Sequence, residues 1–343
     1  MSVAPERRAS RFAELIFFLF LALGSAFSKP ATSLAAERIR LAVPTVAVMY
    51  APIYLGVQQG IFLTEGMDLE ITAMRTDLAI AALGTGEIDY LAHGGAALRA
   101  AALGFPLKLV FALDHKAPFW LVSRGAIENV TMLKGKKIGL SFPGDTPQLV
   151  LKRFLRRQGV DSEREVSFIF GQFSPTALQS LMGGILDAAV LAPPFNVLAE
   201  ERGLRVLAFL GAAVPDATTS NGIVTSDRKI KAQPEQVRRM VRASFKSLMA
   251  FRQKKAAALD LLVAHFDISR KVAEKVYSQA LDILTPAGEI SREKVRNILN
   301  MMEEAGQKVP PTLQPESVLD FSFLTEVRRE FASGTPGGKK TRP

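Results

Sequence analysis

The chain has 343 residues, a formal net charge of +10 and no cysteine. That length accommodates two domains of ordinary size, and the 48% hydrophobic and 22% charged residues are typical of a globular protein. The missing cysteine excludes disulfides, thiolate metal sites, cysteine nucleophiles and an N-terminal lipid anchor on cysteine. Much of the positive charge lies near the two termini and the rest is scattered, which predicts a solvated mixed surface and no nucleic-acid partner.

Residues 1–36 have the layout of a secretory signal peptide. Three arginines within the first eleven residues precede an apolar run from Leu15 to Phe27, and small residues follow up to Ala36. The apolar run is too short to span a bilayer comfortably, so we expect cleavage between about Ala26 and Ala36. An uncleaved anchor is the alternative interpretation. Cleavage would release the protein into the periplasm.

The rest of the chain alternates strand and helix patterns, which predicts an α/β fold with largely parallel sheets. We expect strands at 39–43, 69–73, 88–92, 107–113, 119–123 and 137–141. We expect helices at 52–59, 76–83 and 95–103, and one that runs from Thr146 to Gly159. Thr76 and Thr146 are the expected helix caps, and Gly84 the expected stop of the first capped helix. From Gln233 onward an apolar stripe of helical period predicts a series of helices.

One segment is echoed later in the chain. Residues 82–89 and 180–187 each close a helix, continue with glycine and the pattern Gly-x-Ile/Leu-Asp, and lead into a buried strand. Helix-to-strand turns often share this pattern, so chance similarity and a repeated half both remain open. The echo fits two similar α/β lobes.

Four stretches carry a family resemblance in a fixed order. They are 51–70, 86–90 with Gly94 and Gly95, 133–140 with 144–146, and 184–194. Together they resemble the periplasmic substrate-binding proteins of ABC importers. The similar class binds alkanesulfonates, nitrate or bicarbonate, and thiamine-pyrimidine precursors. The resemblance covers most of residues 38–260.

The resemblance implies a type II periplasmic binding fold, which has two doubly wound α/β lobes, a ligand cleft, a two-strand hinge and C-terminal helices. Lobe 1 would comprise 38–122 and 225–330, lobe 2 would comprise 123–224, and 331–343 would be a disordered tail. The protein would act as a monomer that closes on a small solute and delivers it to an ABC permease and its ATPase. The chain itself has no phosphate-binding loop for ATP.

The predicted ligand site lies in the loops that follow the strands, because open α/β sheets bind ligands beyond the carboxyl ends of their strands. The candidate ligand-binding residues are Thr45, Tyr50, His93, Gly94, Gly95, Ser141, Gly144, Asp145, Thr146, Pro194 and Asn221. The helix start after Ser141 offers backbone amides that suit an anion. Each residue also has a structural interpretation: Tyr50 at the rim, His93 as a cap, Ser141 at a strand end.

Asp145 favours a particular class of ligand. Its carboxylate would repel a sulfonate at this helix start, which favours a neutral or partly aromatic organic ligand unless Asp145 is used for capping. We expect no cofactor and no metal, because His93, His115 and His265 are widely separated and lack ligand spacing.

Two alternatives remain open. One is a cofactor-dependent enzyme on the same fold, similar to the pyrimidine-precursor synthases, for which His93 is the only cleft candidate. The other is a periplasmic sensor module, which would close on its ligand in the same way.

Overall fold

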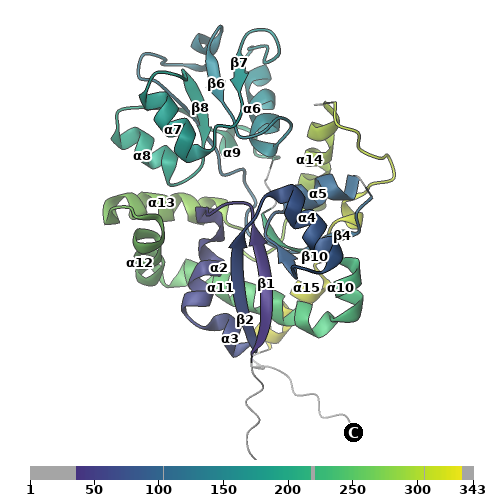
Figure 1. Ribbon diagram of the computed structural model, residues 1–343. Helices are drawn as coiled ribbons and strands as arrows, with labels where there is room; N and C mark the ends of the chain where they lie inside the picture. The colour runs from purple at the N-terminus through teal and green to yellow at the C-terminus, as the bar shows by residue number, and fades with distance from the viewer. Residues whose placement is uncertain (1–35, 103, 218–220, 305, 334–343) are drawn as a thin grey trace, which may run out of the picture. The chain divides into compact units, whose positions relative to one another are not determined.

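The computed structural model describes residues 36–102, 104–217, 221–304 and 306–333 (Figure 1). Two five-stranded sheets organise this part of the chain. The expected signal peptide, apart from Ala36, and the expected tail beyond residue 333 lie outside the described residues. The last helix, α15 (Ser322–Ala332), extends into the segment that the sequence assigned to the tail.

The first sheet has the strand order β2-β1-β3-β10-β4. Its strands are β1 (Glu37–Val43), β2 (Met67–Ala73), β3 (Tyr90–Leu91), β4 (Leu107–Ala112) and β10 (Gly222–Ser226). β1 pairs in parallel with β2 and β3, whereas β10 is antiparallel to both of its neighbours. The flanking helices are α2 (Ala51–Gln58), α4 (Thr76–Thr85), α5 (Gly94–Ala102) and α11 (Pro234–Gln253).

The second sheet has the corresponding order β7-β6-β8-β5-β9. Its strands are β5 (Trp120–Ser123), β6 (Lys137–Gly139), β7 (Ser167–Ile169), β8 (Ala188–Leu191) and β9 (Arg205–Phe209). Here β5 is the antiparallel strand. The accompanying helices are α6 (Thr146–Arg157), α7 (Ser174–Met182), α8 (Phe195–Glu201) and α9 (Leu210–Ala213). The expected mainly parallel α/β fold is confirmed.

The central part of the first sheet is buried on both faces, and side-chain alternation along β1 assigns the faces. Leu41 and Val43 of β1 belong to the core that contains α2 and α11. Ala42 belongs to the core that contains α4 and α5. Figure 1 shows α2 and α11 on one side of β1, and α4 and α5 on the other. Burial on both faces explains why the end of β1, Leu41 to Val43, is apolar throughout, whereas its start carries exposed charged residues.

Helices α2 and α11 approach each other closely at Gly56. A Cβ atom built there would lie 1.9 Å from Ser247 Oγ and 2.9 Å from the Phe62 ring. Only glycine fits without moving these side chains. This contact fixes the helix that follows the first loop of the predicted site.

The internal echo is a structural repeat. Gly86 and Gly184 both have the left-handed backbone conformation, with φ of 90° and 73°. Asp89 then accepts the backbone N–H of Arg40 at 2.8 Å, and Asp187 accepts that of Lys137 at 2.9 Å. The same turn therefore ties the third parallel strand of each sheet to the first, and the repeated-half interpretation is confirmed.

The expected C-terminal helices are also confirmed. They include α12 (Lys255–Phe266), α13 (Arg270–Ile283) and α14 (Arg292–Glu304), besides α11 and α15. Shorter elements are the 3-10 turns η1 (Val48–Tyr50), η2 (Val130–Leu133) and η3 (Pro315–Ser317), and the helices α3 (Ile61–Thr64) and α10 (Asp227–Ala232). Within the described residues, every helix is too short or too polar to cross a membrane.

Three local predictions were wrong. Thr76 is the first residue of α4 and not its cap, and the helix continues through Gly84 to a left-handed stop at Gly86. Thr146 likewise lies inside α6, because Asp145 is the N-cap and accepts the Gln148 amide. Because aspartate is at least as good an N-cap as threonine, the N-cap is Asp145, one residue before the predicted position.

The chain passes between the sheets twice. It leaves the first sheet after β4 and enters the second at β5, and it returns through α9 to β10. The predicted boundary at 122/123 falls within β5, and the one at 224/225 falls within β10. The division into two lobes at those positions stays a prediction.

Candidate functional site

Four loops leave the carboxyl ends of parallel strands. Residues 44–47 follow β1, and residues 92–93 follow β3, at one edge of the first sheet. Residues 140–145 follow β6, and residues 192–194 follow β8, at one edge of the second sheet. These loops carry most of the predicted ligand-binding residues.

The first predicted pair is Tyr50 and Asn221. The hydroxyl of Tyr50 donates to Asn221 Oδ1 at 3.1 Å, and the backbone N–H of Asn221 donates to Asp114 Oδ2 at 3.2 Å. Asp114 follows β4, at the start of the crossing to the second sheet, and is fully buried. Burial, with the nearby charge of Asp114, holds the pKa of Tyr50 well above its ordinary value. The phenol is therefore a neutral donor that joins the first loop to the two crossings.

His93 lies directly before α5 and is half-buried. Its Nδ1 atom lies 3.3 Å from Thr76 Oγ1, at the start of α4. Burial, with the positive charge of Arg99, lowers the pKa of His93 to about 3. The ring is therefore neutral at physiological pH. It can exchange hydrogen bonds but is a poor proton acceptor.

The loop before α6 is closed by its own side chains. Asp145 accepts the amides of Phe142 at 3.0 Å and Gln148 at 3.1 Å, and it also accepts the Ser141 hydroxyl. The Gly144 amide donates to the Gln148 side chain. The hypothesis that Asp145 is used for capping is confirmed. Because these three amides already have acceptors, they do not form the expected anion site.

The other predicted residues are spread over the same edges. Thr45 is exposed after β1, and Gly94 and Gly95 are buried at the start of α5. Pro194 is buried and precedes α8, and Thr146 is buried inside α6. No hydrogen bond within the described residues joins Thr45 or Pro194 to another predicted residue, so their ligand role stays a prediction.

Sequence analysis missed Arg99, on α5. Its side chain is half-buried and interacts electrostatically with His93 and with Asp145, which belong to loops of the two different sheets. Burial lowers its pKa, and Asp145 partly opposes this shift. The available signal was a single arginine in the otherwise small and apolar segment 94–102.

A second missed residue is Asn196, at the start of α8. Its side chain is fully buried, and its Nδ2 donates to Gln279 Oε1 of α13 at 3.1 Å. Its Oδ1 has no hydrogen-bond partner, and neither has the buried hydroxyl of Tyr54 on α2. Asn196 thus joins the edge of the second sheet to a C-terminal helix and keeps one buried acceptor unfilled. A solute or a water molecule can satisfy such an atom.

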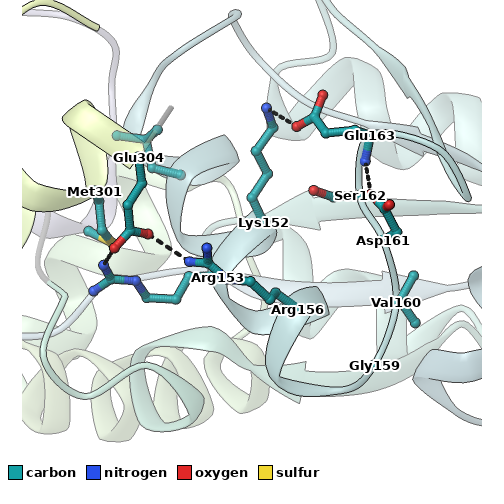
Figure 2. Close-up of a pocket in the computed structure, with 11 residues that line it drawn as sticks. Lys152, Arg153, Arg156, Gly159, Val160, Asp161, Ser162, Glu163, Met301 and Glu304 are labelled. Atoms are coloured by element: carbon teal, nitrogen blue, oxygen red, sulfur yellow. Dashed lines mark hydrogen bonds and ion pairs between the residues drawn. The ribbon is translucent and has the colours of Figure 1, made fainter. Parts of the chain in front are cut away.

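A cavity of about 530 Å³ lies elsewhere, between α6 and α14. Figure 2 shows Arg153 and Arg156 of α6 directed at Glu304 of α14, each at 2.6 Å, and Lys152 directed at Glu163 at 2.6 Å. The charges that line the cavity are therefore paired with one another. None of the predicted site residues lines it, and we place the candidate site at the strand edges.

A metal centre has no support in the described part of the chain. Within residues 36–102, 104–217, 221–304 and 306–333, no group of three or more His, Asp or Glu side chains is arranged to hold an ion.

The chain was assigned to a family by its match to a protein-family model. The model described as "NMT1/THI5 like" matches residues 48–258, which span both sheets. The chain belongs to the NMT1/THI5-like family. A search of the curated proteins found no match for this family member.

Solved structures of the same fold include two transport proteins. The alkanesulfonate-binding protein SsuA from Xanthomonas axonopodis pv. citri, bound to MOPS, is 18% identical with a TM-score of 0.69; the match covers 83% of this chain and 100% of that one. A ligand-binding component of an ABC-type import system from Staphylococcus aureus, with zinc bound, is 18% identical with a TM-score of 0.69, covering 85% and 99%.

A third similar structure is a mutant of DszB in complex with biphenyl-2-sulfinic acid. It is 12% identical with a TM-score of 0.63, and the match covers 86% of this chain and 99% of that one. At such identities the likeness shows the fold alone. It confirms the periplasmic binding fold that the sequence predicted.

The low pKa of His93 predicts an acid-sensitive fold. An unfolded histidine binds a proton near pH 6.5, whereas folded His93 does so only near 3. The unfolded state therefore binds more protons between these values, and stability falls as the pH drops below about 6.5. His93→Gln should show a smaller loss of unfolding free energy between pH 7 and 4.5 than the parent protein, measured by urea denaturation. His265→Gln is the comparison: this side chain is exposed and burial lowers its pKa less than that of His93, so its effect should be the smaller one, and equal losses in all three proteins would contradict the account.

The ion pairs beside the cavity predict that two glutamates, Glu304 and Glu163, contribute unequally to stability. Hydrogen bonds from Arg156 and Arg153 outweigh the effect of burial and lower the pKa of Glu304. Glu304→Gln should reduce the unfolding free energy by about 1 kcal/mol at pH 7, because the Arg153 side chain is only 12% exposed and loses one charged partner.

Glu163→Gln removes a pair of similar length at the same cavity, but the Glu163 side chain is 69% exposed. We expect it to change stability by less than about 0.5 kcal/mol. An equal or larger loss for Glu163→Gln in thermal or urea unfolding would show that burial does not set the strength of these pairs.

Proposed function

We propose that this chain is the solute-binding component of an ABC importer. In this proposal it captures a small organic solute between the strand edges of its two sheets, and it delivers the solute to a membrane permease driven by an ATPase. The observation that carries the proposal is the meeting of the two chain crossings, where the Asn221 N–H donates to Asp114 at 3.2 Å and the Tyr50 hydroxyl donates to Asn221 at 3.1 Å. A double crossing of this kind is a natural hinge.

The similar proteins support the same function. SsuA is an alkanesulfonate-binding protein, and the Staphylococcus protein is the ligand-binding part of an import system. We extend to this chain their general role, and not their particular ligands. We further propose that the signal peptide exports the protein to the periplasm, where it works as a monomer.

Hinge closure supplies the mechanism. A solute that touches loops of both sheets binds the closed arrangement better than the open one, and it shifts the population by that difference in affinity. Contacts between Asn196 and Gln279, and between Gly144 and Gln307, already join the second sheet to the C-terminal segment. Because these contacts join the two parts, closure would change the surface that they present together to a permease.

An enzyme on the same fold is the alternative. Members of this fold include DszB, which is an enzyme. His93 is the titratable candidate at the strand edge, but its low pKa and its contact with Thr76, instead of a carboxylate or lysine, do not suit proton transfer. A sensor module would use the same closure, and a permease and ATPase encoded beside the chain would favour import.

Solute binding is tested with the chain's single tryptophan. Trp120 opens β5 directly after the first crossing and stacks on Phe209 of β9 at 4.4 Å. A panel of acids, sulfonates, pyrimidines and amides should contain a solute that raises the melting temperature. At a hundredfold excess over Kd the gain is about 2.7 kcal/mol. The same solute should change Trp120 fluorescence and reduce the radius of gyration in solution scattering.

Two results would contradict the proposal. One is a panel without any thermal shift, from protein shown by mass spectrometry to hold no co-purified small molecule. The other is turnover of the bound compound, which would favour the enzyme.

A further inference from the structure

Arg99 differs from every other arginine with a half-buried side chain in the described residues. The others each form a hydrogen bond or an ion pair: Arg153, Arg238, Arg239, Arg242 and Arg252. Arg99 forms neither within the described part of the chain, although it is half-buried. A guanidinium withdrawn from water without an acceptor is costly, so such a group is expected to have a partner in the working protein.

Among the described residues, the neighbours of Arg99 do not give it a hydrogen-bond acceptor. His93 carries no charge at physiological pH. Asp145 interacts with Arg99 electrostatically, but its two carboxylate oxygens already accept from Ser141, Phe142 and Gln148. The five N–H donors of Arg99 therefore remain available at the place where loops of the two sheets approach each other.

Exposed apolar side chains border the same loops. Phe142, three residues before Asp145, is 55% exposed, and Phe173, at the start of α7, is 43% exposed. Their rings meet edge to face at 5.0 Å. From the first sheet, Val46 after β1 is 53% exposed and Leu78 on α4 is 56% exposed. These groups offer an apolar surface to a flat ring.

We propose that the solute is a small organic acid with an apolar, ring-sized group, and that Arg99 is the residue that binds its anionic oxygens. This inference rests on the proposed function. The planar guanidinium fork fits a carboxylate through two parallel hydrogen bonds, and a sulfonate offers the same oxygens in a tetrahedral group. The anion thus binds on α5, and not at the start of α6, where Asp145 fills the amides.

The test uses matched pairs of probes that keep the ring and change the charge. The pairs are benzoate with benzamide, phenylacetate with phenylacetamide, and benzenesulfonate with benzenesulfonamide; acetate supplies the charge without the ring. Calorimetric titration of the purified full-length protein should show at least one acid that binds tenfold or more tightly than its neutral partner and than acetate. Carboxylate and sulfonate arms show which anion the site prefers.

Variants of Arg99 separate binding from folding. Arg99→Gln should weaken binding of the preferred acid at least tenfold and abolish its advantage over the neutral partner, and Arg99→Lys should retain part of it. Without solute, Arg99→Gln should melt at the same temperature as the parent protein or higher, because no hydrogen bond is lost and removal of the half-buried charge offsets the lost attraction to Asp145. Arg202→Gln changes an exposed arginine at the C-terminal end of α8; it is the control and should bind as the parent does.

The inference is overturned if a neutral solute binds as tightly as its acid, if only neutral or cationic solutes bind, or if Arg99→Gln leaves the affinity for the acid unchanged. In each of these cases the binding-protein proposal stands. Absence of binding by any solute of any charge, with no co-purified small molecule, would instead count against the proposed function itself.

Discussion

The arrangement of the candidate site depends on the hydrogen bonds at Asp114. This aspartate is fully buried, so its carboxylate must be satisfied by nearby donors, and the Asn221 amide is one of them. Asp114 belongs to the outgoing crossing and Asn221 to the returning one, and the Tyr50 hydroxyl adds the first loop. One buried junction therefore fixes where the two sheets are connected, while the loops farther away stay free to adjust to a solute.

The double crossing follows from a construction used twice. In each sheet four strands run in one direction and one runs in the opposite direction, β10 in the first sheet and β5 in the second, and the chain forms that strand as it arrives from the other sheet. Asp89 and Asp187 make the same hydrogen bond in each repeat, because each accepts a backbone N–H from the first parallel strand of its sheet. Each repeat contains one strand that the chain forms on arriving from the other sheet, so the chain crosses between the sheets twice. The predicted ligand loops lie at the carboxyl ends of the parallel strands in both repeats.

Local sequence patterns were enough for the fold. Short apolar segments such as Leu41 to Val43 alternate with helical patterns that end near glycines, so the alternation of strands and helices and the repeat could be predicted. The errors are one-step errors of cap choice at Thr146 and of stop choice at Gly84, where neighbouring Asp145 and Gly86 fit better. Strand ends also indicated the positions of Tyr50 and His93, and the expected return crossing indicated that of Asn221; their ligand role stays a prediction.

The chemistry of the site was less predictable, because it depends on which partners are already taken. Asp145 was expected to repel an anion at the start of α6, but it serves the loop by accepting several hydrogen bonds. Arg99 was overlooked, because a helical pattern in the sequence shows on which face of the helix a residue lies. It does not show that this face is close to a loop of the second sheet. The same holds for Asn196, whose unfilled Oδ1 becomes visible only when α13 is packed against α8. The organic acid that we propose therefore differs from the neutral or partly aromatic solute that the sequence favoured.

The central claim is that the solute binds between the strand edges of the two sheets. The most direct measurement is a crystal structure of the protein purified with its native solute. The account predicts solute density in contact with residues from both edges, within 44–50, 92–95 and Arg99 on the first sheet and 140–145 and 192–196 on the second. Density confined to the cavity between α6 and α14, with the strand-edge loops empty, would contradict it.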